Sequence, residues 1–352
     1  MDITKHDKNL IVPTKIEREG LVYFNVEEDP RFSVYGVKHD DGKYRRMPET
    51  VAKAVSTGVH GLHALTAGGR VRFVTDSPYI AIYAKMGNVG KLSHFALTGS
   101  AGFDLYAEER YVNTFVPPYN VADAWESVVD LRDDMWDGAH MYTIHMPLFS
   151  EVVELYVGVR EGSLLQSAPQ YRYSVPVVYY GSSITNGACA SRPGNAYENI
   201  LSRLLDCDHI NLGFSGSALA EDAMADYITG LEMSAFVYDY DHNAPSPEYL
   251  KNTHSAMFHR IREARPDLKI LMLSRPQYHL DGNERAMLQI IQNTYEDAIA
   301  AGDENVWFIP GPKLLNEQVW DTALVDNCHP NDSGFASMAY AIRDVLKQML
   351  EK

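Results

Sequence analysis

The pattern of hydrophobic and polar positions changes about halfway along the chain. In the first half, short segments rich in β-branched and aromatic residues alternate with turn residues such as the pairs Gly68-Gly69 and Pro117-Pro118. Short strands with closely spaced turn signals are typical of an antiparallel sandwich or jelly roll. The predicted strands span residues 20–26, 32–37, 71–75, 79–84, 102–106, 111–116, 141–146 and 152–159. One short helix is predicted over residues 47–59.

Beyond a connector at residues 161–173, apolar strand-like runs alternate with helical patterns. The strands are predicted at 176–180, 209–212, 235–239, 269–274 and 306–309, and the helices at 196–205, 219–229, 247–264, 284–301 and 334–350. Five such units predict a parallel sheet covered by helices on both faces. Right-handed crossovers would bring the carboxyl ends of the strands to one edge, where ligands bind. The sequence therefore predicts a β-sandwich domain over residues 1–165 and an α/β domain over residues 174–352.

Composition narrows the function classes. The 352 residues carry a formal net charge of −16, which argues against a nucleic-acid or anionic-membrane partner, because phosphate contacts need clustered Lys and Arg. The cysteines at 189, 207 and 328 form neither a disulfide framework nor a zinc-site pattern. Residues 1–9 are polar and contain no apolar signal core, so we expect a cytoplasmic protein. The sequence leaves self-association into a homo-oligomer open.

Two distant segments carry candidate chemistry. The apolar run at 177–181 leads directly into Ser182 and Ser183, and Asp326 stands three residues before His329. A serine hydroxyl is a weak nucleophile until a base removes its proton, and a histidine held by a carboxylate is such a base. Taken singly, Ser183 could cap the next helix and residues 326–329 could be a polar loop. Taken together, they predict a hydrolytic triad with Ser183 as nucleophile and Ser182 as the weaker alternative.

Four blocks in order resemble the SGNH, or GDSL-type, hydrolases, a superfamily of esterases and acyltransferases. They begin at residues 181, 211, 239 and 326 and read GSS, NLGFSG, DYDHN and DNCH. The resemblance implies an oxyanion hole built from the Ser183 amide, Gly216 and Asn243. It also implies that no cofactor or metal is needed. The first block has Ser182 where the family has aspartate, and the third has Asp241 and Ala244 where the family has glycine and an acid.

The run GFDLY at residues 102–106 resembles the Gly-x-Asp-Leu-Tyr signature of a bacterial subgroup of this family. Members of the subgroup join an amino-terminal jelly roll to a flavodoxin-like SGNH domain, and carbohydrate esterases of similar build exist. The resemblance implies a serine esterase for short acyl groups, acetyl above all, on a small-molecule or oligosaccharide substrate. Trp125 and Trp136 are candidates for a sugar platform. The alternatives are an acyltransferase with the same site and a non-catalytic carbohydrate-binding protein.

Overall fold

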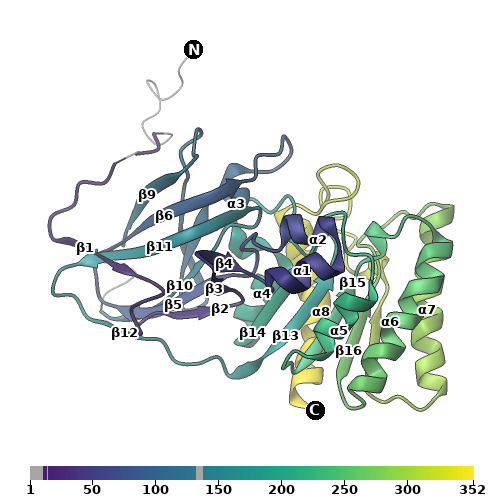
Figure 1. The fold of residues 1–352 in the computed structure, drawn as a ribbon. Helices are drawn as coiled ribbons and strands as arrows, with labels where there is room; N and C mark the ends of the chain where they lie inside the picture. The colour runs from purple at the N-terminus through teal and green to yellow at the C-terminus, as the bar shows by residue number, and fades with distance from the viewer. Residues whose placement is uncertain (1–10, 14, 132–137) are drawn as a thin grey trace.

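The computed structural model describes residues 11–13, 15–131 and 138–352. Residues 1–9, on which the cytoplasmic prediction rests, and Trp136 lie outside these ranges. Figure 1 shows a strand-rich half beside a half in which helices flank a parallel sheet. None of the helices in the described ranges is long and apolar enough to cross a membrane.

The strand-rich half is a sandwich of two antiparallel sheets. The described strands of the first follow the order β1-β11-β6-β9, and those of the second follow β12-β5-β10-β7-β8 with β2 also paired to β5. The first sheet comprises β1 (Leu21–Asn25), β6 (Tyr79–Val89), β9 (Ala124–Asp130) and β11 (Ser150–Arg160). The second comprises β2 (Ser33–Tyr35), β5 (Arg70–Thr75), β7 (Phe103–Ala107), β8 (Arg110–Phe115), β10 (His140–His145) and β12 (Leu165–Ser167). Alternate side chains such as Val71, Phe73, Ile80 and Ile82 are fully buried between the sheets, as a sandwich core requires.

The other half contains a parallel sheet with the strand order β14-β13-β15-β16-β17 among the described residues. This order places the first strand between the second and the third, as in flavodoxin-like folds, and confirms the predicted fold class. The strands are β13 (Tyr173–Gly181), β14 (Cys207–Gly213), β15 (Ala235–Asp239), β16 (Lys269–Leu273) and β17 (Val306–Ile309). β15, β16 and β17 are nearly continuous apolar runs because both faces of the sheet are buried, whereas β14 also carries the polar residues Asp208, His209 and Asn211.

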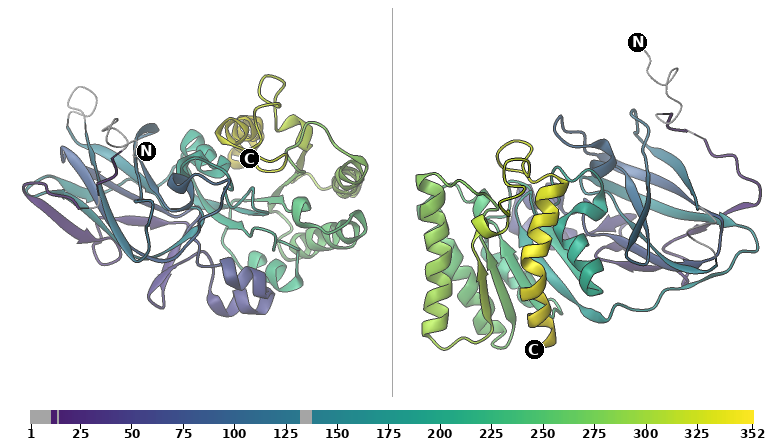
Figure 2. Two further views of the ribbon diagram at one scale, coloured as in Figure 1. Left: turned by 90° about the horizontal axis from the view of Figure 1, so that it is seen from above. Right: turned by 180° about the vertical axis from the view of Figure 1, so that it is seen from behind.

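Helices cover both faces of this sheet. One face packs against α5 (Asp222–Thr229), α6 (Pro247–Ala264) and α7 (Gly282–Ala300), and the other against α4 (Tyr197–Leu205) and α8 (Asp332–Glu351). Figure 2 shows α8, in yellow, running along its face of the sheet.

The first half of the chain also contributes to the core of the α/β half. Where one helix was predicted over residues 47–59, the chain forms α1 (Glu49–Val55) and α2 (Thr57–Leu62). Ala52 and Val59 of these helices belong to the buried apolar cluster on one face of the parallel sheet, and α1 lies beside α5 (Figure 1). A fragment beginning at residue 174 would therefore expose part of its own core.

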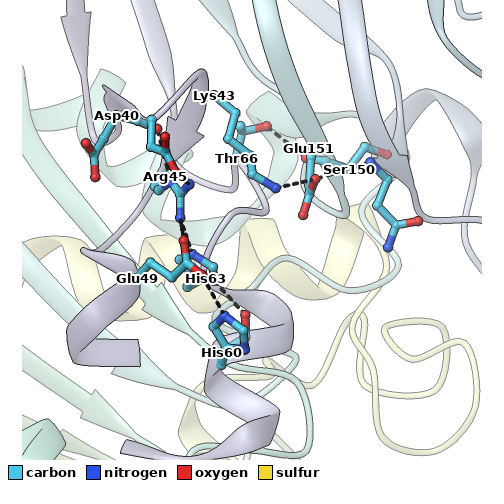
Figure 3. A network of polar contacts seen from close by, with 11 residues as sticks. Asp40, Lys43, Arg45, Glu49, His60, His63, Thr66, Ser150 and Glu151 are labelled. Atoms are coloured by element: carbon cyan, nitrogen blue, oxygen red, sulfur yellow. Dashed lines mark hydrogen bonds and ion pairs between the residues drawn. The ribbon is translucent and has the colours of Figure 1, made fainter. Parts of the chain in front are cut away.

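A partly buried polar network ties α1 and α2 to the hairpin of β3 (Lys38–Asp40) and β4 (Lys43–Arg45) (Figure 3). The Arg45 guanidinium is 2.7 Å from the Glu49 carboxylate and 2.9 Å from Nε2 of His63. Nδ1 of His63 is 2.6 Å from the carbonyl oxygen of His60, so the imidazole donates from Nδ1 and accepts from Arg45 at Nε2. Burial, followed by the charge of Arg45, lowers the pKa of His63 and keeps this neutral tautomer.

Several short elements depart from the sequence prediction. The hairpin β3–β4, strand β9 and helix α3 (Leu97–Ser100) were not predicted. The connector predicted at 161–173 contains β12, which pairs with β5 and so belongs to the sandwich. Three-residue strands are too short to show a period, and β9 carries two acids and a serine among its seven residues.

Candidate active site

Ser183 lies just beyond the carboxyl end of β13. A Cβ at Gly181, the last residue of the strand, would lie 2.1 Å from the carbonyl oxygen of Asp239 on β15, so only glycine fits. The chain then turns sharply, and the N–H of Ala188 donates to the carbonyl oxygen of Ser183 at 2.9 Å. Ser183 is half-buried, which leaves its hydroxyl reachable at the sheet edge.

Ser182 occupies a different environment. Its side chain is fully buried, and its hydroxyl oxygen accepts a hydrogen bond of 3.2 Å from the N–H of Ile184. A hydroxyl in this position stabilises the turn and is closed to substrate. The arrangement favours Ser183 over Ser182 as the nucleophile.

Ser183, His329 and Asp326 form a continuous chain of hydrogen bonds. The Oγ of Ser183 is 2.8 Å from Nε2 of His329, and Nδ1 of His329 is 2.8 Å from Oδ2 of Asp326. The backbone N–H of His329 also donates to Oδ1 of Asp326 at 2.8 Å. Both carboxylate oxygens therefore hold the histidine, one through the ring and one through the main chain. The three-residue spacing makes this possible within one loop ahead of α8.

The Asp326 carboxylate is suited to a charged role. Its partial burial raises the pKa, but hydrogen bonds from the backbone and imidazole of His329 outweigh this effect and leave the pKa below its usual value. An ionised carboxylate at Nδ1 fixes the tautomer that presents Nε2 to Ser183 as an acceptor.

Free hydrogen-bond donors lie at the ends of the neighbouring strands. Among the described residues, no group accepts from the backbone N–H of Ser183 or of Gly216. Gly216 follows β14 in a left-handed conformation with φ of +66°, which favours glycine. Asn243 follows β15, and its Nδ2 donates one hydrogen bond, of 3.0 Å, to the carbonyl oxygen of Phe214. An amide nitrogen carries two donors, so the second is open to a ligand.

One of the two departures in the third block has a structural explanation. Asp241, which stands where the family has glycine, is fully buried and accepts a hydrogen bond of 3.1 Å from the N–H of Arg275 beyond β16. The Arg275 guanidinium also binds Glu284 of α7 at 2.8 Å. Asp241 thus ties the loop that carries Asn243 to the next strand end. The neighbouring His242 is half-buried, with its Nδ1 3.6 Å from Sγ of Cys328 beside the triad histidine.

Two residues of the strand-rich half reach the triad, from the segment between β6 and α3. Nε2 of His94 is 3.8 Å from Oδ2 of Asp326, and the His94 ring is centred 5.8 Å from that of His329. The Phe95 ring lies edge-on to Phe149, with centroids 4.6 Å apart, and 6.4 Å from the His329 ring. No local pattern at residues 91–96 marks this role, since it arises only from the packing of the two halves.

The GFDLY run at 102–106 anchors the loop that follows the serine turn. The carboxylate of Asp104 is fully buried and accepts from Nη1 of Arg192 at 3.0 Å, the N–H of Gly194 at 2.8 Å and Nδ1 of His145 at 2.9 Å. The hydroxyl of Tyr106 also accepts from Arg192. The acid and the tyrosine of the signature thus join the sandwich to residues 192–194.

Two groups of potential metal ligands in the described ranges share the triad histidine. The ligand atoms of His94, Cys189 and His329 lie within 4.8 Å of one another, as do those of Asp326, Cys328 and His329. A metal bound at either place would occupy the imidazole that the triad uses, so the two roles compete.

The sugar-platform prediction for Trp125 is wrong. Trp125 is 5% exposed and its ring packs on Phe103 inside the sandwich, because β9 directs this side chain inward. A side chain in this position is core and has no face open to a sugar.

Comparison with known proteins agrees with this architecture. Residues 174–347 match the model of the GDSL-like lipase/acylhydrolase family, and residues 21–165 match a model described as the N-terminus of SGNH-hydrolase-type esterases. A search of curated protein sequences finds no match.

Solved structures share the whole two-part fold. A protein of Bacteroides ovatus described as a GDSL-like lipase is 24% identical, with a TM-score of 0.83 over 94% of this chain and 98% of its own. The salicylyl-acyltransferase SsfX3 of a tetracycline biosynthetic pathway is 18% identical, with a TM-score of 0.74 over 95% and 98%. A family two carbohydrate esterase of Cellvibrio japonicus is 12% identical, with a TM-score of 0.61 over 94% and 98%. With the two model matches spanning most of the sequence, the chain belongs to the SGNH, or GDSL-type, ester hydrolases and carries the amino-terminal domain of the Gly-x-Asp-Leu-Tyr subgroup.

Proposed function

We propose that the protein hydrolyses short acyl esters, acetyl esters above all, on a carbohydrate, through an acyl-enzyme formed on Ser183. The hydrogen-bonded chain of Ser183, His329 and Asp326 is the observation that carries the proposal. The carbohydrate substrate is inferred from shared architecture, since the related folds include family two carbohydrate esterases and an acetyl xylan esterase. The domain limits at 165 and 174 and the cytoplasmic location remain predictions.

In the first step, Oγ of Ser183 attacks the ester carbonyl carbon and Nε2 of His329 takes the hydroxyl proton. Asp326 stabilises the imidazolium through Nδ1. The carbonyl oxygen becomes an oxyanion that accepts hydrogen bonds from the N–H groups of Ser183 and Gly216 and from Nδ2 of Asn243. Each such donor is worth about 3–4 kcal/mol in the transition state.

In the second step, the C–O bond to the alcohol breaks and His329 returns the proton to the leaving oxygen. Water then attacks the acyl-enzyme and gives a proton to His329, and Ser183 recovers its proton as the carboxylic acid departs. In both steps His329 alternates between proton acceptor and proton donor. All proton transfers are therefore accounted for without an external redox or metal partner.

The acyl preference can be tested with a series of esters of one alcohol. We expect kcat/KM for acetyl esters to exceed that for octanoyl and longer esters by at least about tenfold, because each added methylene must find apolar surface to gain binding energy. The measurement is hydrolysis of p-nitrophenyl esters from C2 to C12, followed by acetylated oligosaccharides. A kcat/KM that rises steadily with chain length would contradict the proposal.

Phe95 provides a test of the contact between the two halves at the site. Replacing Phe95 by alanine removes the ring that packs between Phe149 and His329, so the imidazole loses part of its support. We expect kcat on p-nitrophenyl acetate to fall about tenfold with little change in KM, since a misplaced catalytic group costs rate rather than ground-state binding. Leu92→Ala, an exposed position in the same segment, is the matched control and should keep kcat within about twofold. An unchanged kcat in Phe95→Ala would show that the Phe95 ring does not support the catalytic imidazole.

Acyl transfer is the second candidate, because the salicylyl-acyltransferase has the same two-part fold. The acyl-enzyme would then pass its acyl group to an alcohol in place of water. Product analysis with p-nitrophenyl acetate and an added sugar separates the two candidates. A hydrolase releases acetate in proportion to p-nitrophenol at every sugar concentration, whereas a transferase diverts most of the acetyl group to the sugar.

A further inference from the structure

A cavity of about 610 Å³ lies between the second sheet of the sandwich and the carboxyl end of α4. Its walls come from β5, β10, the turn between β7 and β8, the connector and α4. Since α4 runs antiparallel to the strands of the parallel sheet, its last turn lies at the edge opposite Ser183. A nine-residue helix spans about 14 Å, so the cavity is separate from the candidate active site.

Arg72 of β5 lines this cavity with unpartnered donors. The residue is 3% exposed, and its guanidinium lies 3.9 Å from the centroid of the Tyr171 ring. Its Nη2 contacts Sδ of Met141, a weak acceptor, and is 4.0 Å from the carboxylate of the exposed Asp206. Its Nε and Nη1 are buried and have no hydrogen-bond partner in the described part of the chain. Buried guanidinium donors without acceptors are strongly unfavourable, so an unseen partner is required.

Arg203 of α4 lines the same cavity from the other half of the protein. Its guanidinium lies 3.9 Å from the centroid of the Tyr106 ring, and its Nη1 is likewise buried without a partner among the described residues. Burial lowers the pKa of Arg203 and outweighs the opposite effect of the nearby Tyr106 and Asp104. The two cations belong to different halves and border one internal space.

The acidic groups of the cavity lie nearer the solvent. Glu108, Glu109 and Asp206 are exposed at the rim beside Arg110, whereas Arg72 is buried at the floor. Positive charge at the floor favours an anion small enough to pass the rim, and the acidic groups of the rim disfavour a large polyanion that would have to lie across it.

We propose that this cavity binds a small oxyanion, a carboxylate or phosphate group whose oxygens accept hydrogen bonds from Arg72 and Arg203. The planar guanidinium fork matches both groups. An anion held by β5 on one side and α4 on the other joins the sandwich to the α/β half, so its binding stabilises the folded chain.

The test is titration calorimetry of the full chain with sodium phosphate and, separately, with sodium D-glucuronate, each against sodium chloride at matched ionic strength. We expect one of the two to bind with 1:1 stoichiometry and to raise the melting temperature by at least about 2 °C at a hundredfold excess over Kd. Preference between the two probes tells whether phosphate or carboxylate is the natural group. Absence of binding by both, or binding no stronger than chloride, would overturn the proposal and leave water as the occupant.

Arg203→Gln should weaken binding of the effective probe at least about tenfold, since it removes one charged partner. Arg110→Gln, at the exposed rim, is the matched control and should bind within about twofold of the parent. Arg72→Gln should match Arg203→Gln, and circular dichroism checks its fold; if it does not fold, Arg203→Gln carries the test. Unchanged affinity in Arg203→Gln would place the anion elsewhere and overturn the proposal.

Discussion

Replacing Ser183 by alanine is expected to lower kcat for p-nitrophenyl acetate by at least about 10³-fold, because the proposed nucleophile is lost. The loss should leave KM and the melting temperature nearly unchanged, since within the described ranges the hydroxyl of the half-buried Ser183 bonds only to His329. Purified variants compared by initial rates and thermal unfolding provide the measurement.

Ser182→Ala is the matched control for this change. It removes a buried hydroxyl that accepts one backbone hydrogen bond, so a stability cost of about 1 kcal/mol is expected while hydrolysis continues. An active Ser183→Ala together with a folded but inactive Ser182→Ala would reverse the assignment of the nucleophile.

Replacing Asp104 by alanine should cause the largest loss of stability. The change removes the carboxylate that accepts from Arg192, which keeps the Tyr106 hydroxyl as an acceptor, and it leaves the Gly194 N–H and the buried His145 without their partner. Burial lowers the pKa of His145 to about 4, so the imidazole is neutral at pH 7 and its Nδ1–H also loses its acceptor. Breaking such a buried pair costs about 3–5 kcal/mol.

The measurement for Asp104→Ala is urea-induced unfolding, with Glu109→Ala on the exposed turn of the same sheet as control. The control should unfold within about 0.5 kcal/mol of the parent. A free energy of unfolding in Asp104→Ala within about 1 kcal/mol of the parent would show that the signature acid does not hold the two halves together.

The sequence predicts the α/β half more closely than the sandwich, for a physical reason. Parallel strands such as β15, β16 and β17 are buried on both faces and read as apolar runs. Helix α6 matches the predicted limits because Pro247 begins it after the capping residue Ser246. The sandwich contains three-residue strands such as those of the β3–β4 hairpin. Their pairing depends on distant partners and leaves no periodic signal.

Local spacing also explains which site residues could be found. Asp326 and His329 are close in sequence, and Ser183 follows an apolar strand, so each carries a visible pattern. His94 and Phe95 reach the triad only through packing of the sandwich on the α/β half. The pairing of Asp104 with Arg192 could not be predicted from local spacing either, because Arg192 is 88 residues away and lies in the other half.

The packing of α1 and α2 against the parallel sheet could not be predicted from their position among the strands of the first half. Their buried residues, such as Ala52 and Val59, cover apolar surface of the α/β half. Tests of the contribution of the first half to catalysis therefore belong in the full chain, at positions such as Phe95, rather than in a truncated fragment.

Covalent trapping tests the central claim, that Ser183 is an activated nucleophile. A fluorophosphonate transfers its phosphonyl group to an activated serine oxygen with loss of HF, and fragmentation mass spectrometry locates the adduct within one residue. We expect one adduct per chain, on Ser183, with loss of esterase activity at the same rate, and no adduct in His329→Ala. Inactivation with the adduct on Ser182 or on any residue other than Ser183 would contradict it.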